Sequence, residues 1–299
     1  MTESTPSIHT PVLLHEVVEG LGTPRVYLDG TLGGAGHALA MAQHVKGKLT
    51  VIGLDRDPAA ITRARALLEG IAERVILEHT DFRNMDLALD AHSIKEVDAI
   101  LLDLGISSDE LDASGKGFSF LKDEPLYMTM GNPADQAFTA KDIVNTWEEE
   151  TIADVIFGYG EERYARRIAR NIINYRAKKL IETTAELCEI IKMSVPGMYR
   201  HGKIHPATRT FQALRIAVND ELGALTEGLR KGYERLASGG RMAVISFHSL
   251  EDRIVKDFNK ARAVEGALIV TKKPITASPE ERAVNPRSRS AKLRILVKP

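Results

Sequence analysis

Several residue types and segments that define common protein classes are scarce or missing in this sequence. The 299-residue chain has a single cysteine, Cys188, which excludes an internal disulfide and a cysteine-cluster metal site. Its nine histidines are scattered, without an H-E-x-x-H or similar pair, so no metal is expected. No uninterrupted apolar run is long enough to span a bilayer, and the first residues show no secretory pattern. We therefore expect a cytoplasmic protein that has no membrane partner.

The chain also lacks a strong net charge. Its formal charge is −1 at pH 7, so any binding of nucleic acid has to come from local basic patches and not from an overall field. The sequence has no internal repeat and no low-complexity segment. With 43% hydrophobic residues, the chain is long enough for one large domain or two smaller ones, each with its own core.

The most informative stretch that is present lies between residues 26 and 42. The apolar run 26–28 predicts a strand, Asp29 closes it, and residues 37–42 predict a helix. Between them stand four glycines: Gly30, Gly33, Gly34 and Gly36. Glycine lets the backbone turn sharply and approach a ligand closely, and the helix presents unpaired N–H groups to that ligand. The stretch predicts a loop for a nucleotide-like cofactor, with an ordinary tight turn as the alternative.

The spacing of these glycines favours one cofactor. They do not supply the dinucleotide pattern G-x-G-x-x-G. An aspartate followed by glycines at short intervals is more similar to the S-adenosylmethionine loop of class I methyltransferases, D/E-x-G-x-G-x-G. In this chain Thr31 and Ala35 stand where two of those glycines would be. S-adenosylmethionine is therefore the expected cofactor.

Acidic residues follow three further apolar runs that predict strands. The runs cover 49–54, 75–79 and 97–102, and the residues after them include Asp55, Asp81 with Phe82, and Asp103. Ligands of open α/β sheets bind beyond the carboxyl ends of the strands, so we expect these side chains and Asp29 to converge on one crevice. Asp57 and Pro58 predict the start of the next helix, as its cap and its first residue. Asp55 would accept hydrogen bonds from ribose hydroxyls, with a second capping carboxylate as the alternative. Asp81 and Phe82 would bracket an adenine, unless Phe82 is plain core.

No strand-like run occurs between Leu111 and Val218. Helical runs fill the interval at 140–147, 150–157, 161–178 and 184–193, and strands return at 241–246, 267–271 and 293–297. An interruption of this length is the size of a small domain. We predict an α/β fold in which residues 1–110 and 215–299 form a class I, Rossmann-like methyltransferase domain with a mostly parallel sheet. Residues 111–214 form an inserted all-α domain for RNA recognition.

Positive charge is concentrated in three groups of arginines. The residues are Arg163, Arg166, Arg167 and Arg170, then Arg209 and Arg215, then Arg287 and Arg289. In a helix over 161–178, the first group lies on one face, at i, i+3, i+4 and i+7. Arginines with interleaved aromatic residues suit phosphate contacts and base stacking. The alternative is a solvated helix face whose arginines pair with Glu161 and Glu162.

A histidine and a serine follow the expected strand 241–246. His248, Ser249 and Asp252 do not form a hydrolase triad, because neighbouring His and Ser on one turn lack the geometry and no G-x-S-x-G elbow is present. The segment can line the same crevice as the acidic strand ends. His248 would then contact the substrate, with a structural role as the alternative.

Nine segments together resemble one family. They are 9–14, 29–31 with 36–37, 55–58, 102–108, 117–120, 159–163, 205–212, 246–253 and 285–287. Along nearly its whole length the chain is similar to the small-subunit (16S) ribosomal RNA cytosine-N4 methyltransferase family, of the RsmH or MraW type. The resemblance implies methyl transfer from S-adenosylmethionine to N4 of a cytosine in the decoding (P-site) region of the small ribosomal subunit. It also implies a cofactor site at Ala35, Gly36, His37, Asp55, Phe82, Asp103 and Glu110.

The chain departs from the family pattern at a few positions. Ala35 replaces a glycine and Glu110 replaces a glutamine. In the segment that the family writes P-L-D-M-R-M, Tyr127 and Thr129 replace the charged pair.

The chemistry of cytosine N4 methylation needs no covalent intermediate. The exocyclic amine is a poor nucleophile, so the enzyme must hold it in line with the methyl group and accept a hydrogen bond from it. Asp103 is expected to orient the methionine moiety or the amine, with Ser107 and Ser108 as further acceptors. The stacking aromatic residue would be Phe118, Phe120 or Phe247.

Two other functions remain open at this stage. One is a methyltransferase of DNA, another RNA or a small molecule; the other is a non-catalytic ribosome-assembly factor. The sequence also leaves open whether the chain forms a homodimer.

Overall fold

The computed structural model describes residues 11–46, 48–105 and 115–299. The chain forms two compact units, one with residues up to Gly105 and from Leu222 onward, the other with residues 106–221. The sequence placed these boundaries after residues 110 and 214. Residues 215–221 lie in the helical unit, because α11 (Thr208–Asn219) continues past residue 214 and Arg215 donates two hydrogen bonds to Glu221.

The first unit is built on one seven-stranded sheet with the order β3-β2-β1-β4-β5-β7-β6. The strands are β1 (Val26–Asp29), β2 (Thr50–Asp55), β3 (Arg74–His79), β4 (Val97–Asp103), β5 (Leu236–Ser246), β6 (Leu268–Ile269) and β7 (Lys292–Val297). Strands β1 to β5 are parallel to one another, and β7 is antiparallel to β5 and β6. The mostly parallel sheet confirms the predicted fold class, although β6 is shorter than the strand predicted at 267–271.

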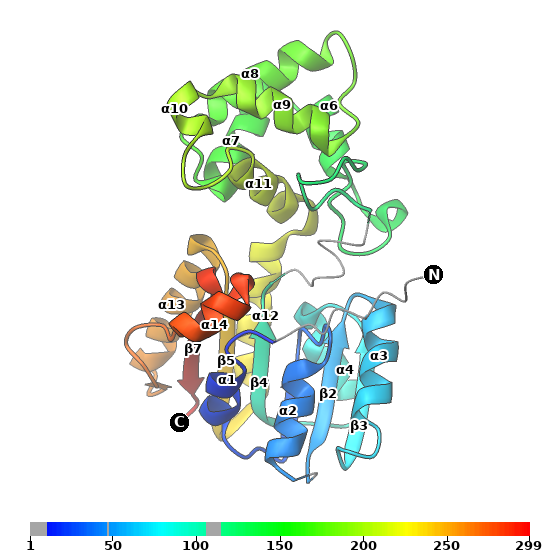
Figure 1. The fold of residues 1–299 in the computed structure, drawn as a ribbon. Helices are drawn as coiled ribbons and strands as arrows, with labels where there is room; N and C mark the ends of the chain where they lie inside the picture. Colours follow the sequence, from blue (N-terminus) through cyan, green and yellow to red (C-terminus); the bar gives the residue numbers. More distant parts are fainter. Residues whose placement is uncertain (1–10, 47, 106–114) are drawn as a thin grey trace. The chain divides into compact units, whose positions relative to one another are not determined.

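Helices cover both faces of this sheet (Figure 1). They are α1 (Leu14–Leu21), α2 (Gly36–His44), α3 (Pro58–Leu68), α4 (Met85–Ala91), α12 (Glu221–Arg235), α13 (Ser249–Val264) and α14 (Pro279–Val284), with 3-10 turns η1 (Phe82–Asn84) and η3 (Pro286–Ser290). Neighbouring strand residues enter two different cores: Tyr27 joins the core that contains Met41 of α2, and Leu28 joins the core that contains Leu229 of α12. Burial on both faces makes the central strands continuous apolar runs, which is why the sequence revealed them.

The chain changes direction across the sheet between β1 and β4. From β1 it proceeds outward to β2 and β3, and it then returns to β4 and continues to β5. In open parallel sheets such a switch point leaves a crevice outside the carboxyl ends of the two central strands. Asp29 ends β1 and Asp103 ends β4, so the topology places these two residues at the crevice.

Two helix starts show what the local sequence does and does not determine. Asp57 caps α3, with its side chain accepting a hydrogen bond from the Ala59 N–H at 2.9 Å and Pro58 in the first position, as predicted. Helix α1 begins at Leu14, although the apolar pattern of this segment already starts at Val12. Leu13 adopts a left-handed conformation, φ 54°, and its N–H donates to Glu281 Oε1 at 2.8 Å, a contact that the local sequence does not contain.

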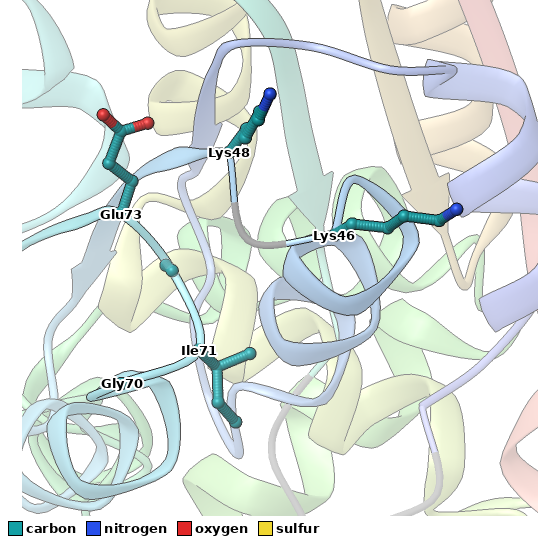
Figure 2. Close-up of a pocket in the computed structure, with 6 residues that line it drawn as sticks. Lys46, Lys48, Gly70, Ile71 and Glu73 are labelled. Carbon is teal, nitrogen blue, oxygen red and sulfur yellow. The ribbon is translucent and has the colours of Figure 1, made fainter.

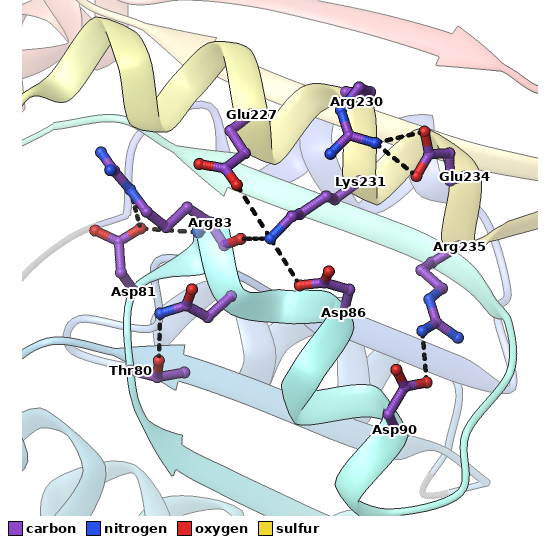
Figure 3. Close-up of polar contacts among 11 residues, drawn as sticks. Thr80, Asp81, Arg83, Asp86, Asp90, Glu227, Arg230, Lys231, Glu234 and Arg235 are labelled. Carbon is purple, nitrogen blue, oxygen red and sulfur yellow. Dashed lines mark hydrogen bonds and ion pairs between the residues drawn. The ribbon is translucent and has the colours of Figure 1, made fainter.

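Charged side chains fasten α12 to η1 and α4 (Figure 3). Lys231 Nζ lies 2.7 Å from the carbonyl oxygen of Arg83, 3.0 Å from Asp86 Oδ1 and 3.2 Å from Glu227 Oε1. These contacts hold the turn that follows β3, which carries Asp81 and Phe82.

The second unit is helical in its described part. It contains η2 (Pro133–Asp135), α6 (Ala140–Thr146), α7 (Glu149–Gly160), α8 (Ala165–Arg176), α9 (Thr184–Ser194), α10 (Gly197–Arg200) and α11. Its own core includes Ile143, Ile156 and Ile168. The helix predicted over 161–178 is wrong at its start, because Glu161 takes a left-handed conformation, φ 49°, and ends α7. Among the residues that the structure describes, no helix is both long and apolar enough to cross a membrane.

Candidate functional site

The loop between β1 and α2 is packed too closely to admit larger residues at two glycines. A Cβ on Gly30 would lie 2.6 Å from Leu102 Cδ2 and 3.0 Å from Phe82 Cβ. A Cβ on Gly36 would lie 2.3 Å from Pro11 Cγ. Gly33 adopts φ 49°, a left-handed conformation that costs glycine little. The predicted glycine loop is therefore present, directly at the end of β1.

Ala35 carries strain in this loop. It caps α2 with φ 57° and ψ 17°, and it is fully buried. A left-handed conformation costs a residue with a Cβ roughly 1 to 2 kcal/mol. The alanine that replaces the family's glycine is thus held in the conformation for which glycine is suited.

Several amides of this loop are free to bind a ligand. Within the described residues, the N–H groups of Gly34, Gly36 and His37 donate no hydrogen bond. The N–H of Gly33, by contrast, donates to Asp55 Oδ2 at 2.7 Å. Unpaired amides at the start of a helix favour a negatively charged group.

Asp29 faces inward and stabilises the turn. Its carboxyl accepts hydrogen bonds from the Tyr27 hydroxyl at 3.0 Å and from the Thr31 N–H at 3.2 Å. Only 1% of the residue is exposed, and burial raises its pKa to about 6. Both oxygens of Asp29 have partners within the protein.

Asp103 is different, because one of its oxygens is buried without a hydrogen-bond partner among the described residues. That atom is Oδ1, while Oδ2 lies 3.8 Å from His37 Nδ1. Burial raises the pKa of Asp103 to about 7, and the charge of Glu251 adds to the rise. Native proteins rarely leave a buried polar atom unsatisfied, so Oδ1 is a candidate ligand contact.

Thr31 positions Asp103, and His37 lies beside it. His37 Nε2 lies 3.0 Å from the carbonyl oxygen of Val12, which can only accept, so Nε2 carries the proton. Burial lowers the pKa of His37, and its Nδ1 lies 3.8 Å from Asp103 Oδ2, beyond hydrogen-bond distance. The Asp103 N–H donates to the Thr31 hydroxyl at 2.6 Å. Thr31 was not among the predicted site residues.

Asp55 joins the end of β2 to the glycine loop. Its Oδ2 accepts from Gly33 as described, and Oδ1 accepts from the N–H of Asp57 at 2.8 Å. Burial raises its pKa. Asp55 therefore shapes the loop in this structure, and its contact with a ribose stays a prediction.

The residues after β3 have partners of their own. Asp81 Oδ1 accepts from the Arg83 N–H at 2.8 Å, and Oδ2 lies 3.4 Å from Arg56 Nη1. Phe82 packs its ring against α12, where a Cβ on Gly228 would lie 2.5 Å from Phe82 Cδ2. The ring thus belongs to the core on that face of the sheet, which is the alternative that the sequence left open.

Glu251 organises the end of β5. This buried residue accepts hydrogen bonds from the N–H groups of Phe247 at 2.8 Å and His248 at 3.3 Å. His248 in turn caps α13, with Nδ1 accepting from the Glu251 N–H at 3.4 Å and Nε2 3.1 Å from Glu251 Oε1. The Phe247 ring lies against Gly105, two residues beyond Asp103.

The sequence analysis missed Glu251, although its spacing from the cap contains a signal. An acidic side chain three residues after a helix cap is the capping-box pattern. Here the cap is a histidine and not the usual serine or threonine. Ser107, Ser108 and Glu110, which were also predicted, lie outside the described residues.

The first arginine group does not form one helix face. Arg163 precedes α8, and its guanidinium lies over the rings of Tyr164 and Tyr199, at 4.8 and 5.0 Å. Arg170 pairs with Glu149 at 3.2 Å, and not with the predicted Glu161 or Glu162. The prediction failed because the turn at 161–164 breaks the periodicity. Arg166 and Arg167 lie exposed on α8.

The remaining predicted substrate contacts are placed as follows. Arg209 donates to the carbonyl oxygen of Glu161 at 3.2 Å, and the half-buried Arg215 binds Glu221. Phe118 is buried in the helical core, and Phe120 packs against that core and stacks on His205. In η3, Arg287 is half-buried and Arg289 is exposed.

A surface pocket of about 520 Å³ lies at the other end of the sheet (Figure 2). Its lining residues are Lys46, Lys48, Gly70, Ile71, Ala72 and Glu73. Lys48 and Glu73 precede β2 and β3, whereas the site residues follow the ends of these strands. The pocket is therefore separate from the site at the strand ends.

Comparisons with known proteins identify the family of this chain. Residues 6–299 match the model of the MraW methylase family. The chain is 48% identical to the ribosomal RNA small subunit methyltransferase H of Heliobacterium modesticaldum, over 96% of this chain and 97% of that protein. It is 50% identical to the protein of the same name from Deinococcus deserti, over 96% and 92% of the two chains. The chain therefore belongs to the MraW methylase family, as its motifs predicted, and its cofactor is S-adenosylmethionine.

Proposed function

We propose that this protein transfers a methyl group from S-adenosylmethionine to N4 of a cytosine in the decoding region of 16S ribosomal RNA. The observation that carries the proposal is the Asp103 carboxyl, which is buried at the sheet's switch point and whose Oδ1 has no hydrogen-bond partner among the described residues. The names of the relatives support ribosomal RNA of the small subunit as the substrate. A ribosomal substrate would place the enzyme in the cytoplasm.

The residues at the strand ends fit the chemical groups of S-adenosylmethionine. The unpaired amides of Gly34, Gly36 and His37 would bind its carboxylate. Asp103 would accept from its ammonium group, and Asp55 from its ribose hydroxyls. When bound, this cofactor supplies a methyl group on a positively charged sulfur.

The protein's own task is to position the cytosine amine. An amine whose lone pair is delocalised into the ring reacts only when it is held in line and donates a hydrogen bond to a fixed acceptor. Asp103 would hold the methionine moiety of the cofactor, and Ser107 and Ser108 are the candidate acceptors for the amine. Phe247 and His248, at the end of β5, would contact the base. The methylated amine would release its proton to the acceptor that it hydrogen-bonds, and no covalent intermediate with the enzyme forms.

The lone cysteine is consistent with this direct transfer. Cys188 belongs to the core of the helical unit, with 6% of its surface exposed, and burial raises the pKa of its thiol. A buried thiol with a raised pKa is a poor nucleophile.

We further propose that the unit with the sheet carries out the transfer while the helical unit, 106–221, binds RNA. The exposed Arg163, Arg166 and Arg167 provide the positive charge for phosphate contacts. A protein of nearly neutral net charge needs such local patches.

Transfer of labelled methyl groups tests this function. Unmodified small ribosomal subunits, their free 16S RNA and duplex DNA are each incubated with the enzyme and S-adenosylmethionine. We expect label on N4 of one cytosine in the ribosomal RNA, and loss of label with the variant Asp103→Asn. Label on DNA alone, or cofactor binding without transfer to any nucleic acid, would refute the proposal in favour of the other functions considered above.

A further inference from the structure

A cluster of aromatic and charged residues in the helical unit has no role in methyl transfer itself. It joins the turn between α7 and α8 (residues 161–164), helix α10 and the start of α11. At its centre lies Glu162, a carboxylate with 0% exposure. A charge buried so completely requires hydrogen-bond partners that offset the free energy lost with its hydration.

The partners of Glu162 are the groups that shape the cluster. Its Oε1 accepts from the N–H of Tyr164 at 2.8 Å, and its Oε2 accepts from the hydroxyl of Tyr199 at 2.5 Å. The two tyrosine rings meet edge to face, 5.0 Å apart. Glu162 thereby fixes both rings relative to the turn that precedes α8.

The two rings hold the guanidinium of Arg163. Its carbon Cζ lies 4.8 Å from the Tyr164 ring centre and 5.0 Å from that of Tyr199, distances typical of cation–π contacts. Arg163 is exposed and, within the described residues, forms no salt bridge. Its N–H donors are therefore available to a ligand while its position is restricted.

A second arginine is attached to the same turn. Arg209 Nη1 donates to the carbonyl oxygen of Glu161, the residue that ends α7. Helices α7 and α11 approach so closely there that a Cβ on Gly160 would lie 2.6 Å from the Arg209 carbonyl oxygen. The positive charges of Arg209 and Arg163 both act to lower the pKa of Tyr199, although burial and Glu162 still raise it to about 12.

We propose that Arg163 and Arg209 form a binding site for a phosphodiester of the RNA backbone, with Glu162, Tyr164 and Tyr199 as its positioning residues. Planar guanidinium groups match the oxygens of a phosphate, and an arginine already held in place loses less entropy when it binds. The inference rests on the proposed RNA substrate and names the site at which the helical unit would hold the RNA.

The test measures binding and not only activity. Unmodified small ribosomal subunits and a labelled single-stranded RNA with the decoding-region sequence are titrated with the full-length protein at several salt concentrations. We expect Arg163→Ala and Arg209→Ala to weaken binding of the probes about tenfold each. Loss of one phosphate contact also makes the slope of log K against log salt about 0.7 less steep for single-stranded RNA.

Two further variants test whether binding depends on the position of Arg163 or only on the number of positive charges in the helical unit. Tyr199→Phe keeps the ring below Arg163 but removes the bond to Glu162, so we expect a smaller effect of about threefold. Lys179→Ala removes a positive charge of the same unit that already pairs with Glu186, and it should change binding less than twofold. In the transfer assay, KM for the subunit should rise for Arg163→Ala while kcat stays unchanged.

The results distinguish this site from the proposed function. If the wild type methylates the RNA but Arg163→Ala and Arg209→Ala bind as Lys179→Ala does, the site is refuted and the function stands. If the wild type binds neither subunits nor RNA, both the phosphodiester site and the proposed RNA substrate are refuted. If binding is weakened as expected but no methyl transfer occurs, the site stands and the proposed function falls.

Discussion

Two buried aspartates, one at the end of β1 and one at the end of β4, differ in the hydrogen bonds that their carboxyl groups accept. Asp29 has a partner for each oxygen, Tyr27 on one and Thr31 on the other. Asp103 leaves Oδ1 without a partner in the described structure. Burial raises the pKa of both, to about 6 for Asp29 and about 7 for Asp103. Position at a strand end and a shifted pKa therefore do not distinguish the two carboxyls, whereas their hydrogen bonds do, and on this difference we base the proposed role of Asp103.

Replacing Asp103 should produce the largest loss of activity. Asp103→Asn keeps the size of the side chain but removes the charge and one acceptor oxygen, so we expect kcat to fall by about 100-fold or more. Because burial raises the pKa of Asp103 to about 7, the neutral amide should not lower the free energy of unfolding at neutral pH. Initial rates of methyl transfer and urea unfolding measure the two effects. Loss of stability in proportion to the lost activity would show that Asp103 is structural after all.

Replacing Asp29 should produce the reverse pattern. Asp29→Ala leaves the Tyr27 hydroxyl and the Thr31 N–H buried without their acceptor, which should lower the free energy of unfolding by about 2 kcal/mol. Urea unfolding at neutral pH measures the change. The Asp29→Asn variant, which retains an acceptor, should lose less. Equal stability of wild type and Asp29→Ala would show that the hydrogen bonds of Asp29 do not stabilise the fold.

The two carboxyls should also differ in the pH range over which they change the free energy of unfolding. Both have folded-state pKa values above the usual 3.8, so between about pH 4 and about pH 7 the folded protein holds more protons than the unfolded chain. The contribution of these two groups to the free energy of unfolding then falls as pH rises across this range, by at most about 1.4 kcal/mol per pH unit for each group. In Asp103→Asn, the free energy of unfolding should no longer show the part of its decrease with pH that extends to about pH 7. Urea titrations at intervals across the range measure this, and an unchanged profile contradicts the assignment.

A smaller effect is expected at the end of β5. Glu251→Gln weakens the hydrogen bonds to Phe247 and His248, so transfer should slow by about tenfold, a rough estimate for disturbed positioning. Removal of the Glu251 charge also lowers the pKa of Asp103, which should shift the midpoint of the pH–rate profile downward. Asp252→Asn is the matched control, because Asp252 pairs with Lys292 and Arg294. Equal pH midpoints in the two variants would exclude this role for Glu251.

The smallest effect is expected at Ala35. Glycine relieves the left-handed strain of roughly 1 kcal/mol but adds freedom to the unfolded chain by a similar amount. Ala35→Gly should therefore change the free energy of unfolding by less than about 1 kcal/mol. Thermal and urea unfolding measure it, and a loss above about 2 kcal/mol would show that the buried methyl group supports the core.

The local sequence determined those parts of the structure that depend on neighbours in the chain. The central strands were predicted because burial on both faces makes them continuous apolar runs. The start of α3 was predicted because Asp57 and Pro58 act within one helical turn. The glycine loop between β1 and α2 was predicted because its glycines are needed where the backbone turns and packs closely.

Distant contacts determined what the sequence analysis missed. Arg163 was placed on α8, but Glu162 turns inward to Tyr199 on α10 and breaks the helix before it. Phe82 packs on Gly228 of α12, which no local pattern indicates. The unpaired oxygen of Asp103 likewise depends on how β1, β4 and α2 meet.

The most direct test of the comparison between the two aspartates is calorimetric titration of S-adenosylmethionine into the wild type, Asp103→Asn and Asp29→Asn at pH 8. A hydrogen bond to a charged group contributes about 2 kcal/mol, so Kd should rise about 30-fold in Asp103→Asn. In Asp29→Asn it should stay within about threefold of the wild-type value. Equal affinities for the wild type and Asp103→Asn would contradict the claim that the unpaired oxygen at the end of β4 binds the cofactor.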